Sequence, residues 1–512
     1  MAIEQKPDQK SQRTVSALLI LAAVVAILPI IFTAPLMDVR FWFTEYVSGM
    51  EYSPINLYEL WQRRLLPGRF VPISDMYTLV YAFVGHKFLQ FTQVSLNYFD
   101  ALTKIALLVL WFLAIRTLFR EIGKGFVQNL NTRLWDLYPA ILFIVWGLGI
   151  NIFWAMNGAV AYPVLIYTAF IVSIWFAIAT LRNIRVLAAT GQTINRMTVV
   201  LLVLSSIWAN FYYEISYTAT AGIVAAILVA PIANLTKSQR VKLSSMFVGS
   251  FALVWVPMRI ILKNQCEANL ELCYDGSQLN LGGMFGTMIQ NLVNPLPFAD
   301  YDAIKDLHHG RIPFVFSGIV LLVAILISIL MFAGLRNAVA DKDSNESVDL
   351  NSFVSAQWRF MLILLTMGAS SAVILSVSIR AQDLVDWGLS YRHTPMLWLG
   401  YAALILLGVT WLAKKTKPVT GAIALIAIVL LLTTGQWGRS WSAVRDYNEN
   451  FEPVSRLYHE LYNADLDDSG LANARRCLII EELSATAKNQ SRYIKPANKF
   501  MNTFHERDFC KS

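Results

Sequence analysis

The residue types best suited to chemistry gather in one polar segment, residues 35–75, directly after the first apolar stretch of the chain. Carboxylates, arginines and aromatic side chains alternate there, among them Asp38, Glu45, Glu51, Glu59, Arg63, Arg64, Arg69, Phe41, Trp42, Tyr46, Tyr52, Tyr58 and Trp61. A carboxylate can take a proton from a hydroxyl group, and a guanidinium fits the oxygens of a phosphate group. An aromatic ring can stack on a sugar. The segment therefore offers the side chains that a site for a phosphate-linked sugar needs.

Asp38 is the preferred candidate for a general base. It follows the first apolar stretch by about one helical turn, so a rigid helix could fix its position at the membrane surface. The alternatives for Asp38 are an ion pair with Arg40 or a cap on the next helix, and Glu45 is the second candidate for the base. Asp75, which lies before an apolar run, is better suited to capping the helix that follows.

The candidates for binding phosphate are Arg69, in the sequence Pro-Gly-Arg-Phe, Arg392, in Ser-Tyr-Arg-His-Thr-Pro, and Arg64 in the same loop as Arg69. Arg69 and Arg392 both stand where a polar loop meets an apolar stretch, close to the expected plane of the lipid headgroups. The alternative for each is ordinary contact with lipid phosphate. Because Tyr391 and His393 flank Arg392, we favour a specific pocket.

A cavity for the sugar or for the acceptor is expected to include residues from several loops and helix ends: Trp42, Tyr391, His393, Tyr213, Glu214 and Asn157. For those at helix ends, capping is an equally good explanation. A divalent cation, Mg²⁺ or Mn²⁺, could be held by His308 and His309 with Asp302 and Asp306. Adjacent histidines chelate one ion poorly, so no metal ligands are assigned, and the divalent cation stays a possible cofactor.

The composition shows what must position these residues. Of the 512 residues 56% are hydrophobic and 15% are charged, whereas soluble domains have about 25% charged residues. Apolar runs of about 20 residues, the length that crosses a bilayer core, recur along the chain, and only helices can satisfy their backbone there. We predict an all-α polytopic membrane protein with about eleven transmembrane helices. Their expected ranges are 15–34, 99–119, 137–154, 160–180, 197–212, 217–233, 243–262, 312–335, 360–379, 395–413 and 419–434.

The polar connections between the predicted spans define two outer loops and a C-terminal region. A first outer loop spans 35–98, and within it residues 74–91 are apolar but interrupted by Gly85-His86-Lys87, which predicts a helix in the membrane interface. A second outer loop spans 263–311. Residues 1–435 form the membrane module, and 436–512 form a small extracytoplasmic region.

The positive charges give the orientation. The short basic connections, 116–133, 182–196, 237–242 and 414–417, all fall on the side of the N-terminus, which places that side in the cytoplasm. An odd number of crossings then places the C-terminus outside an inner (plasma) membrane. This distribution accounts for the net charge of +8 without nucleic acid as a partner.

All four cysteines fall in segments assigned to the outside, as disulfides of an oxidising compartment would. Among three connectivities we favour Cys266–Cys273 and Cys477–Cys510, because they close local loops; unrelated free thiols are the alternative. No Cys-x-x-Cys or histidine pairing has the spacing of a zinc site.

The positions of the ionisable residues favour an enzyme with its active site at the membrane surface. A transporter would carry charges near the middle of its spans. Lys104 and Arg259 are expected near span ends, where their side chains can reach the headgroups.

The whole arrangement resembles the GT-C glycosyltransferases: a cytoplasmic N-terminus, one span, a long outer loop with Asp38 just beyond the span, and Gly68-Arg69-Phe70 before an interfacial helix. The resemblance covers about residues 15–434. It implies transfer of a sugar from a polyprenyl-phosphate donor to a glycan, lipid or protein of the cell envelope. It also implies that Asp38 is the catalytic acid of the first loop and that Arg69 and Arg392 lie near the lipid phosphate. Many relatives have a paired Asp-Glu where this chain has Asp38 followed by Val39, so Glu45 stays open. An O-antigen-type polymerase or ligase, and a transporter or flippase of a lipid-linked sugar, are the alternatives.

Overall fold

The computed structural model describes the greater part of the chain. The described residues are 9–35, 58, 61–62, 65, 70–126, 134–152, 159–160, 163–192, 194–268, 281–296, 314–340, 350–377, 382, 393–415, 418–462, 470–486, 494, 497–498, 501–502 and 508–510. Every regular element within these ranges is a helix.

Within the described residues, seven helices are long and apolar enough to cross a membrane. They are α1 (Gln9–Phe32), α5 (Leu96–Gly123), α7 (Pro163–Ala189), α10 (Lys237–Ala268), α14 (Leu350–Leu375), α16 (Thr394–Lys415) and the helix that starts as α17 (Pro418–Leu432). Four more contain shorter apolar stretches: α6 (Leu134–Gly149), α8 (Arg196–Phe211), α9 (Thr218–Val229) and α13 (Phe314–Ala340). The chain is therefore a polytopic helical membrane protein, as predicted. The predicted total of about eleven crossings requires that all four shorter ones cross as well.

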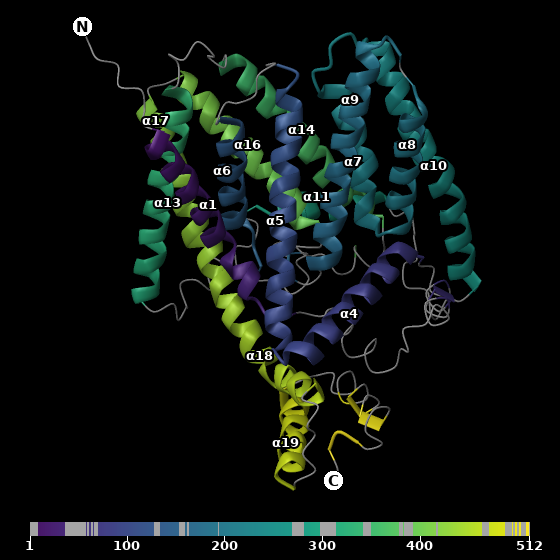
Figure 1. Ribbon diagram of the computed structural model, residues 1–512, viewed down its shortest axis with the longest axis vertical. Helices are drawn as coiled ribbons and strands as arrows, with labels where there is room; N and C mark the ends of the chain where they lie inside the picture. Colours follow the sequence, from purple (N-terminus) through teal and green to yellow (C-terminus); the bar gives the residue numbers. More distant parts are fainter. Residues whose placement is uncertain are drawn as a thin grey trace.

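The long helices run side by side in one bundle (Figure 1). We call the end where α5 begins and where α4 (Pro72–Thr92) lies the α4 end, and the end where α5 finishes the Glu121 end. The amino-terminal part of α1 lies toward the Glu121 end, whereas α18 (Gly438–Tyr462) and α19 (Gly470–Thr486) project beyond the α4 end. The α4 end is thus the predicted outer face, and the Glu121 end is the predicted cytoplasmic face.

Aromatic packing holds the centre of the bundle. The ring of Trp111 on α5 lies 4.7 Å from that of Trp146 on α6 and 5.1 Å from that of Tyr167 on α7. Gly149 ends α6 against the ring of Trp398 on α16, and a Cβ atom at this position would lie 1.9 Å from that ring. Only glycine lets these two helices approach so closely.

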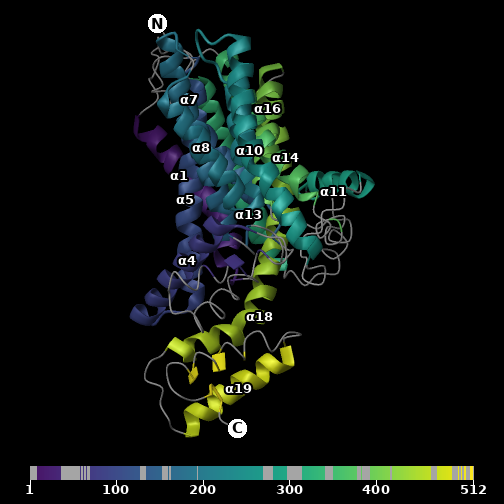
Figure 2. The same cartoon turned by 90° about the vertical axis from the view of Figure 1, so that its right-hand side faces the viewer.

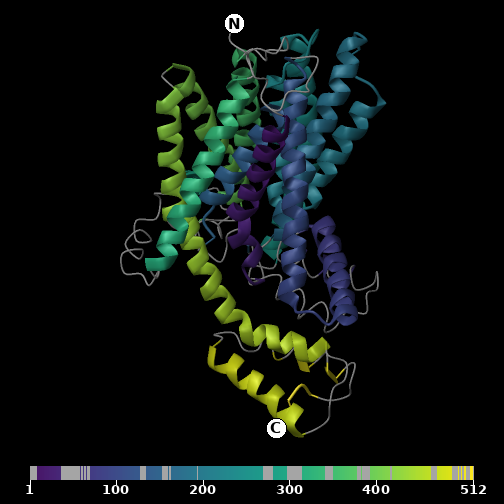
Figure 3. The ribbon, with the colours of Figure 1, turned by 60° about the vertical axis from the view of Figure 1, so that its left-hand side comes forward.

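The last span does not end where the sequence predicted. α17 continues through a π-helical turn, Thr433–Trp437, directly into α18, so one helical rod crosses residues 435–436. Figure 3 shows α18 leaving the bundle and α19 lying alongside it. The indole Nε1 of Trp437 donates to the carbonyl of Ala26 at 3.1 Å, which fixes the turn to α1. The C-terminal region is therefore attached to the bundle by continuous helix.

Candidate functional site at the α4 end

The carboxyl end of α1, which leads into the first outer loop, is held by two other helices. Lys104 of α5 donates from Nζ to the carbonyl of Thr33 at 2.7 Å. Asn448 of α18 accepts from the backbone N–H of Ala34 at 2.7 Å and donates to the carbonyl of Phe32 at 3.0 Å. The bonds to the carbonyls of Phe32 and Thr33 satisfy groups that the carboxyl end of a helix leaves without intrahelical partners. The segment that carries Asp38 therefore starts from a fixed point.

Lys104 itself belongs to a buried ion pair. Its Nζ lies 2.6 Å from Oδ2 of Asp100, one turn earlier on α5, and the two side chains are 0% and 1% exposed. Desolvation of both charges costs several kcal/mol, so such a pair persists only with close geometry and further hydrogen bonds. The prediction that Lys104 extends to the headgroups is wrong, because its ammonium is fully buried. Arg259 is also anchored, with Nη2 donating to the hydroxyl of Tyr217 at 3.2 Å.

The helix α4 turns several polar side chains toward the protein and several large apolar side chains to the outside, and Lys87 and Gln90 near its end are also exposed. Its buried residues include Ser74, Asp75, Thr78, Tyr81 and His86. Its exposed residues include Met76, Val80, Phe83, Val84 and Phe91. A water-facing helix has the opposite arrangement, so the outer side of α4 suits contact with lipid. Among the described helices, α4 is not one of the seven that could cross a membrane.

The predicted helix cap at Asp75 is wrong. Pro72 occupies the first turn of α4, Val71 is the residue before it, and no side chain caps the start. Asp75 lies within the first turn and is buried, where its charge is favourable near the positive end of the helix dipole.

Contacts of α4 with its neighbours are polar and aromatic. The hydroxyl of Tyr77 accepts from Oγ1 of Thr168 on α7 at 3.1 Å, and the ring of Tyr81 lies 5.3 Å from that of Phe99 on α5. Burial, with a further contribution from the Asp100 carboxylate, raises the pKa of Tyr81 well above its usual value. Burial, with a smaller effect of Lys87, lowers the pKa of His86 to about 4, so His86 is neutral near pH 7.

His393 joins α16 to the second outer loop. Its Nε2 lies 2.9 Å from the carbonyl oxygen of Asn291, near the end of α11 (Leu281–Val293), and can only donate to that acceptor. The hydroxyl of Tyr401 donates to the neighbouring carbonyl of Leu292 at 2.6 Å. Burial lowers the pKa of His393 to about 4. Figure 2 shows α11 lying across the direction of the long helices.

Asn291 is a polar residue that the sequence reasoning missed. Its side chain is 1% exposed, and neither Oδ1 nor Nδ2 has a hydrogen-bond partner among the described residues. A signal was present in the spacing: Thr287, Asn291 and Asn294 recur at helical intervals in a mostly apolar segment, and all three are buried.

Tyr213 and Glu214 lie in the connection between α8 and α9. Tyr213 is buried and precedes the 3₁₀ turn Glu214–Tyr217, and Ser216 Oγ donates to the Tyr213 carbonyl at 2.5 Å. These two residues therefore shape a turn, and their contact with a substrate stays a prediction.

Other predicted site residues lie outside the described residues, and their roles stay predictions: Asp38, Glu45, Arg64, Arg69, Arg392, Trp42, Tyr391, Asn157, Asp302, Asp306, His308 and His309. Within the described ranges, no group of three or more His, Cys, Asp or Glu side chains could hold a metal ion.

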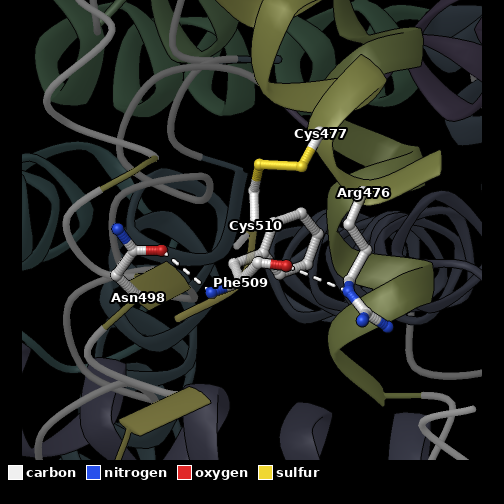
Figure 4. The surroundings of a disulfide bond; sticks show 5 residues. All are labelled: Arg476, Cys477, Asn498, Phe509 and Cys510. Carbon is white, nitrogen blue, oxygen red and sulfur yellow. Dashed lines mark hydrogen bonds between the residues drawn. A yellow bond between two sulfur atoms is a disulfide. The ribbon is translucent and has the colours of Figure 1, made fainter. Parts of the chain in front are cut away.

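The predicted disulfide Cys477–Cys510 is confirmed, and it joins positions 33 residues apart. Figure 4 shows its surroundings: Arg476 Nε donates to the carbonyl of Phe509 at 2.9 Å, and the N–H of Phe509 donates to Oδ1 of Asn498 at 3.1 Å. Closing a loop of this length stabilises the C-terminal region by roughly 3–4 kcal/mol. Cys266 is also disulfide-bonded; its predicted partner, Cys273, lies outside the described residues.

The Glu121 end also holds a buried carboxylate. Glu121 is 2% exposed and lies 2.6 Å from Lys124, 2.8 Å from Arg182 and 2.9 Å from Arg185. Arg240 donates to the carbonyls of Ile227 and Ala230 at the end of α9. The basic connections that set the predicted orientation thus also hold helices together.

Comparisons with known proteins add nothing to this geometry: no protein-family model, no curated protein and no solved structure matches the chain.

Proposed function

We propose that this chain is an integral membrane glycosyltransferase of the GT-C kind. It would transfer a sugar from a polyprenyl-phosphate donor to an envelope glycan, lipid or protein on the extracytoplasmic side of the inner membrane. The observation that carries the proposal is the anchored end of α1: Lys104 and Asn448 hold Thr33, Phe32 and Ala34 directly before the acid-, arginine- and aromatic-rich loop.

The helices α4 and α11 support the same proposal. α4 turns Asp75 and His86 inward and Phe83 outward, and α11 turns Asn291 inward and Phe285 outward. A lipid-linked sugar has the matching character, with an apolar chain for the lipid side and a polar head for the protein side.

The proposed reaction is an in-line displacement at the anomeric carbon. Asp38 takes the proton of the acceptor hydroxyl, with Glu45 as the alternative base. The acceptor oxygen then forms its bond to the anomeric carbon as the bond from that carbon to the phosphate oxygen breaks. Arg69, Arg392 and Arg64 stabilise the charge of the departing lipid phosphate. The arginines act with or without a divalent cation.

The residues proposed to contact the sugar or the acceptor come from the outer loops and helix ends: Trp42, Tyr391, His393, Tyr213, Glu214 and Asn157.

The test is Asp38→Asn in the full-length protein, assayed for transfer of labelled sugar in membranes. Loss of a well-placed base should lower the rate about 10²–10⁴-fold without changing the melting temperature of the purified protein. Glu45→Gln is the matched variant. Activity lost only in Glu45→Gln would move the base to that residue, and full activity in both variants would refute the mechanism.

One observation favours a second candidate, a transporter of a lipid-linked sugar. Asp100 and Lys104 form a fully buried ion pair within α5, and ionisable residues inside spans often mark transport pathways. Protein reconstituted in vesicles distinguishes the two: a transporter moves the intact lipid-linked sugar between leaflets, whereas the glycosyltransferase cleaves the sugar from its phosphate.

A further inference from the structure

The carboxamide of Asn291 occupies a position where an apolar side chain would be more stable. It is buried at 1% exposure with both Oδ1 and Nδ2 unpaired among the described residues. A buried polar group without a partner costs free energy, and the few that persist in native proteins call for an explanation such as a missing ligand. Asn291 offers one hydrogen-bond acceptor and two donor hydrogens to whatever lies there.

The backbone around this amide is fixed before any ligand arrives. His393, directly before α16, and Tyr401, on α16, hold the carbonyls of Asn291 and Leu292 at 2.9 Å and 2.6 Å. The last turn of α11 therefore has a set position against the start of α16. A polar group held in this way is pre-organised, because the cost of ordering it is already met in the folded protein.

The described helices around Asn291 favour an uncharged ligand. The described parts of α11 (Leu281–Val293), of α14 from residue 361 to 375, and of α16 from residue 394 to 401 contain no Asp, Glu, Lys or Arg. The ring of His393 is buried and neutral. An anionic phosphate would find no counter-charge among these groups, whereas a hydroxyl or an acetamido group offers a donor and an acceptor that match an amide.

We infer that Asn291 is a ligand-binding residue whose carboxamide hydrogen-bonds an uncharged hydroxyl- or amide-bearing group. We identify this group as the sugar ring of the donor, an identification that rests on the proposed function. Asn291 thereby contributes to the choice of sugar, because a site that presents unpaired polar groups discriminates against a ligand that cannot pair with them.

The test compares Asn291→Leu with a matched control, Gln357→Leu. Gln357 on α14 is 0% exposed, and its amide atoms also lack partners among the described residues. It lies in the amino-terminal part of α14, close to Arg359, which donates to the carbonyl of Val229 at the Glu121 end. The probes are citronellyl phosphates that carry a hexose, a pentose or an N-acetylhexosamine, and citronellyl phosphate without a sugar. Affinity and melting temperature are measured on the purified full-length protein.

Both variants should melt higher than the wild type without probe, because each removes an unpaired buried amide. Asn291→Leu should weaken binding of the preferred sugar probe about 10- to 100-fold, the equivalent of one or two hydrogen bonds. It should leave citronellyl phosphate binding unchanged. Gln357→Leu should bind every probe as the wild type does.

The inference is overturned if Asn291→Leu binds the sugar probes as the wild type does, which would leave an ordered water as the partner of the amide. It is also overturned if the wild type binds no sugar probe better than citronellyl phosphate. Failure of the proposed function looks different: sugar binding would depend on Asn291, while no sugar would be transferred by the wild type.

Discussion

The two ends of the bundle each bury a carboxylate, but they use it differently. At the α4 end, Asp100 and Lys104 form a one-to-one pair in which both side chains are sealed from solvent. At the other end, Glu121 meets three cations, of which Lys124 is 50% exposed and Arg182 is 53% exposed.

This difference separates two roles for charge in a membrane protein. The cations around Glu121 outnumber the acid and remain partly accessible, which suits a face near the anionic cytoplasmic leaflet. The sealed pair has no such excess, and its ammonium also holds the carbonyl of Thr33. At the α4 end, then, charge fixes the position of a helix end.

The strongest test of this difference is to neutralise one charged side chain at each end of the bundle. Lys104→Met leaves the Asp100 carboxylate buried without a counter-ion and should reduce stability by about 3–5 kcal/mol. Glu121→Gln keeps a hydrogen-bond acceptor among cations that water can reach, and should cost about 1 kcal/mol. Thermal and denaturant unfolding of the purified variants in detergent measures both.

The double variant Asp100→Leu with Lys104→Met is the control, because replacing a buried pair by apolar residues is often neutral. It should recover most of the lost stability without restoring the bond to Thr33. Equal losses in Lys104→Met and Glu121→Gln would contradict the distinction between the two ends.

A smaller effect should appear with pH, and it should arise at the α4 end. His86 and His393 both have pKa values lowered to about 4 by burial, against about 6.5 in an unfolded chain. The unfolded chain therefore binds more protons between these values. Stability should be complete above about pH 6.5 and should fall as the pH drops toward 4, by up to about 3 kcal/mol for each histidine.

Melting temperatures from pH 7.5 to 4.5 measure this effect. The double variant His86→Gln with His393→Gln should show a flatter profile than the wild type. A wild-type profile that stays level through this range would contradict the assignment of two neutral buried histidines.

The smallest effect concerns the second bond partner of α1. Asn448→Ala removes the bonds to Ala34 and Phe32 and should cost about 1–2 kcal/mol. Asn450→Ala, two residues along the same helix, removes only an exposed bond to the carbonyl of Asp446 and should change stability little. Under the proposed function, Asn448→Ala should also lower the rate of sugar transfer, because the loop with Asp38 loses its fixed start. Equal transfer rates in the two variants would show that the anchored end of α1 does not affect the activity of the loop with Asp38.

Several features were predictable because they depend on short stretches of sequence. The apolar run of α1 gives a helix of membrane length whatever surrounds it. Cysteines 477 and 510 lie in the same short terminal region, so their pairing follows from local loop closure. The interruption at Gly85-His86-Lys87 distinguished α4 from the spans.

Other features depend on contacts between distant residues, and the sequence pattern misled there. Lys104 stands near the start of a span, as a headgroup-seeking lysine would, but the end of α1 and Asp100 enclose it. Asp75 precedes an apolar run, as a helix cap would, but Pro72 already begins the helix.

The sequence by itself determined that this chain is a helical membrane protein, with its acids, arginines and aromatic rings concentrated after the first span, because length, hydropathy and residue type are local properties. Only the tertiary structure decided which polar groups are buried together. The bonds Lys104–Thr33, Asn291–His393 and Ala34–Asn448 join residues 71, 102 and 414 positions apart, and separations of that size are set by how the helices pack.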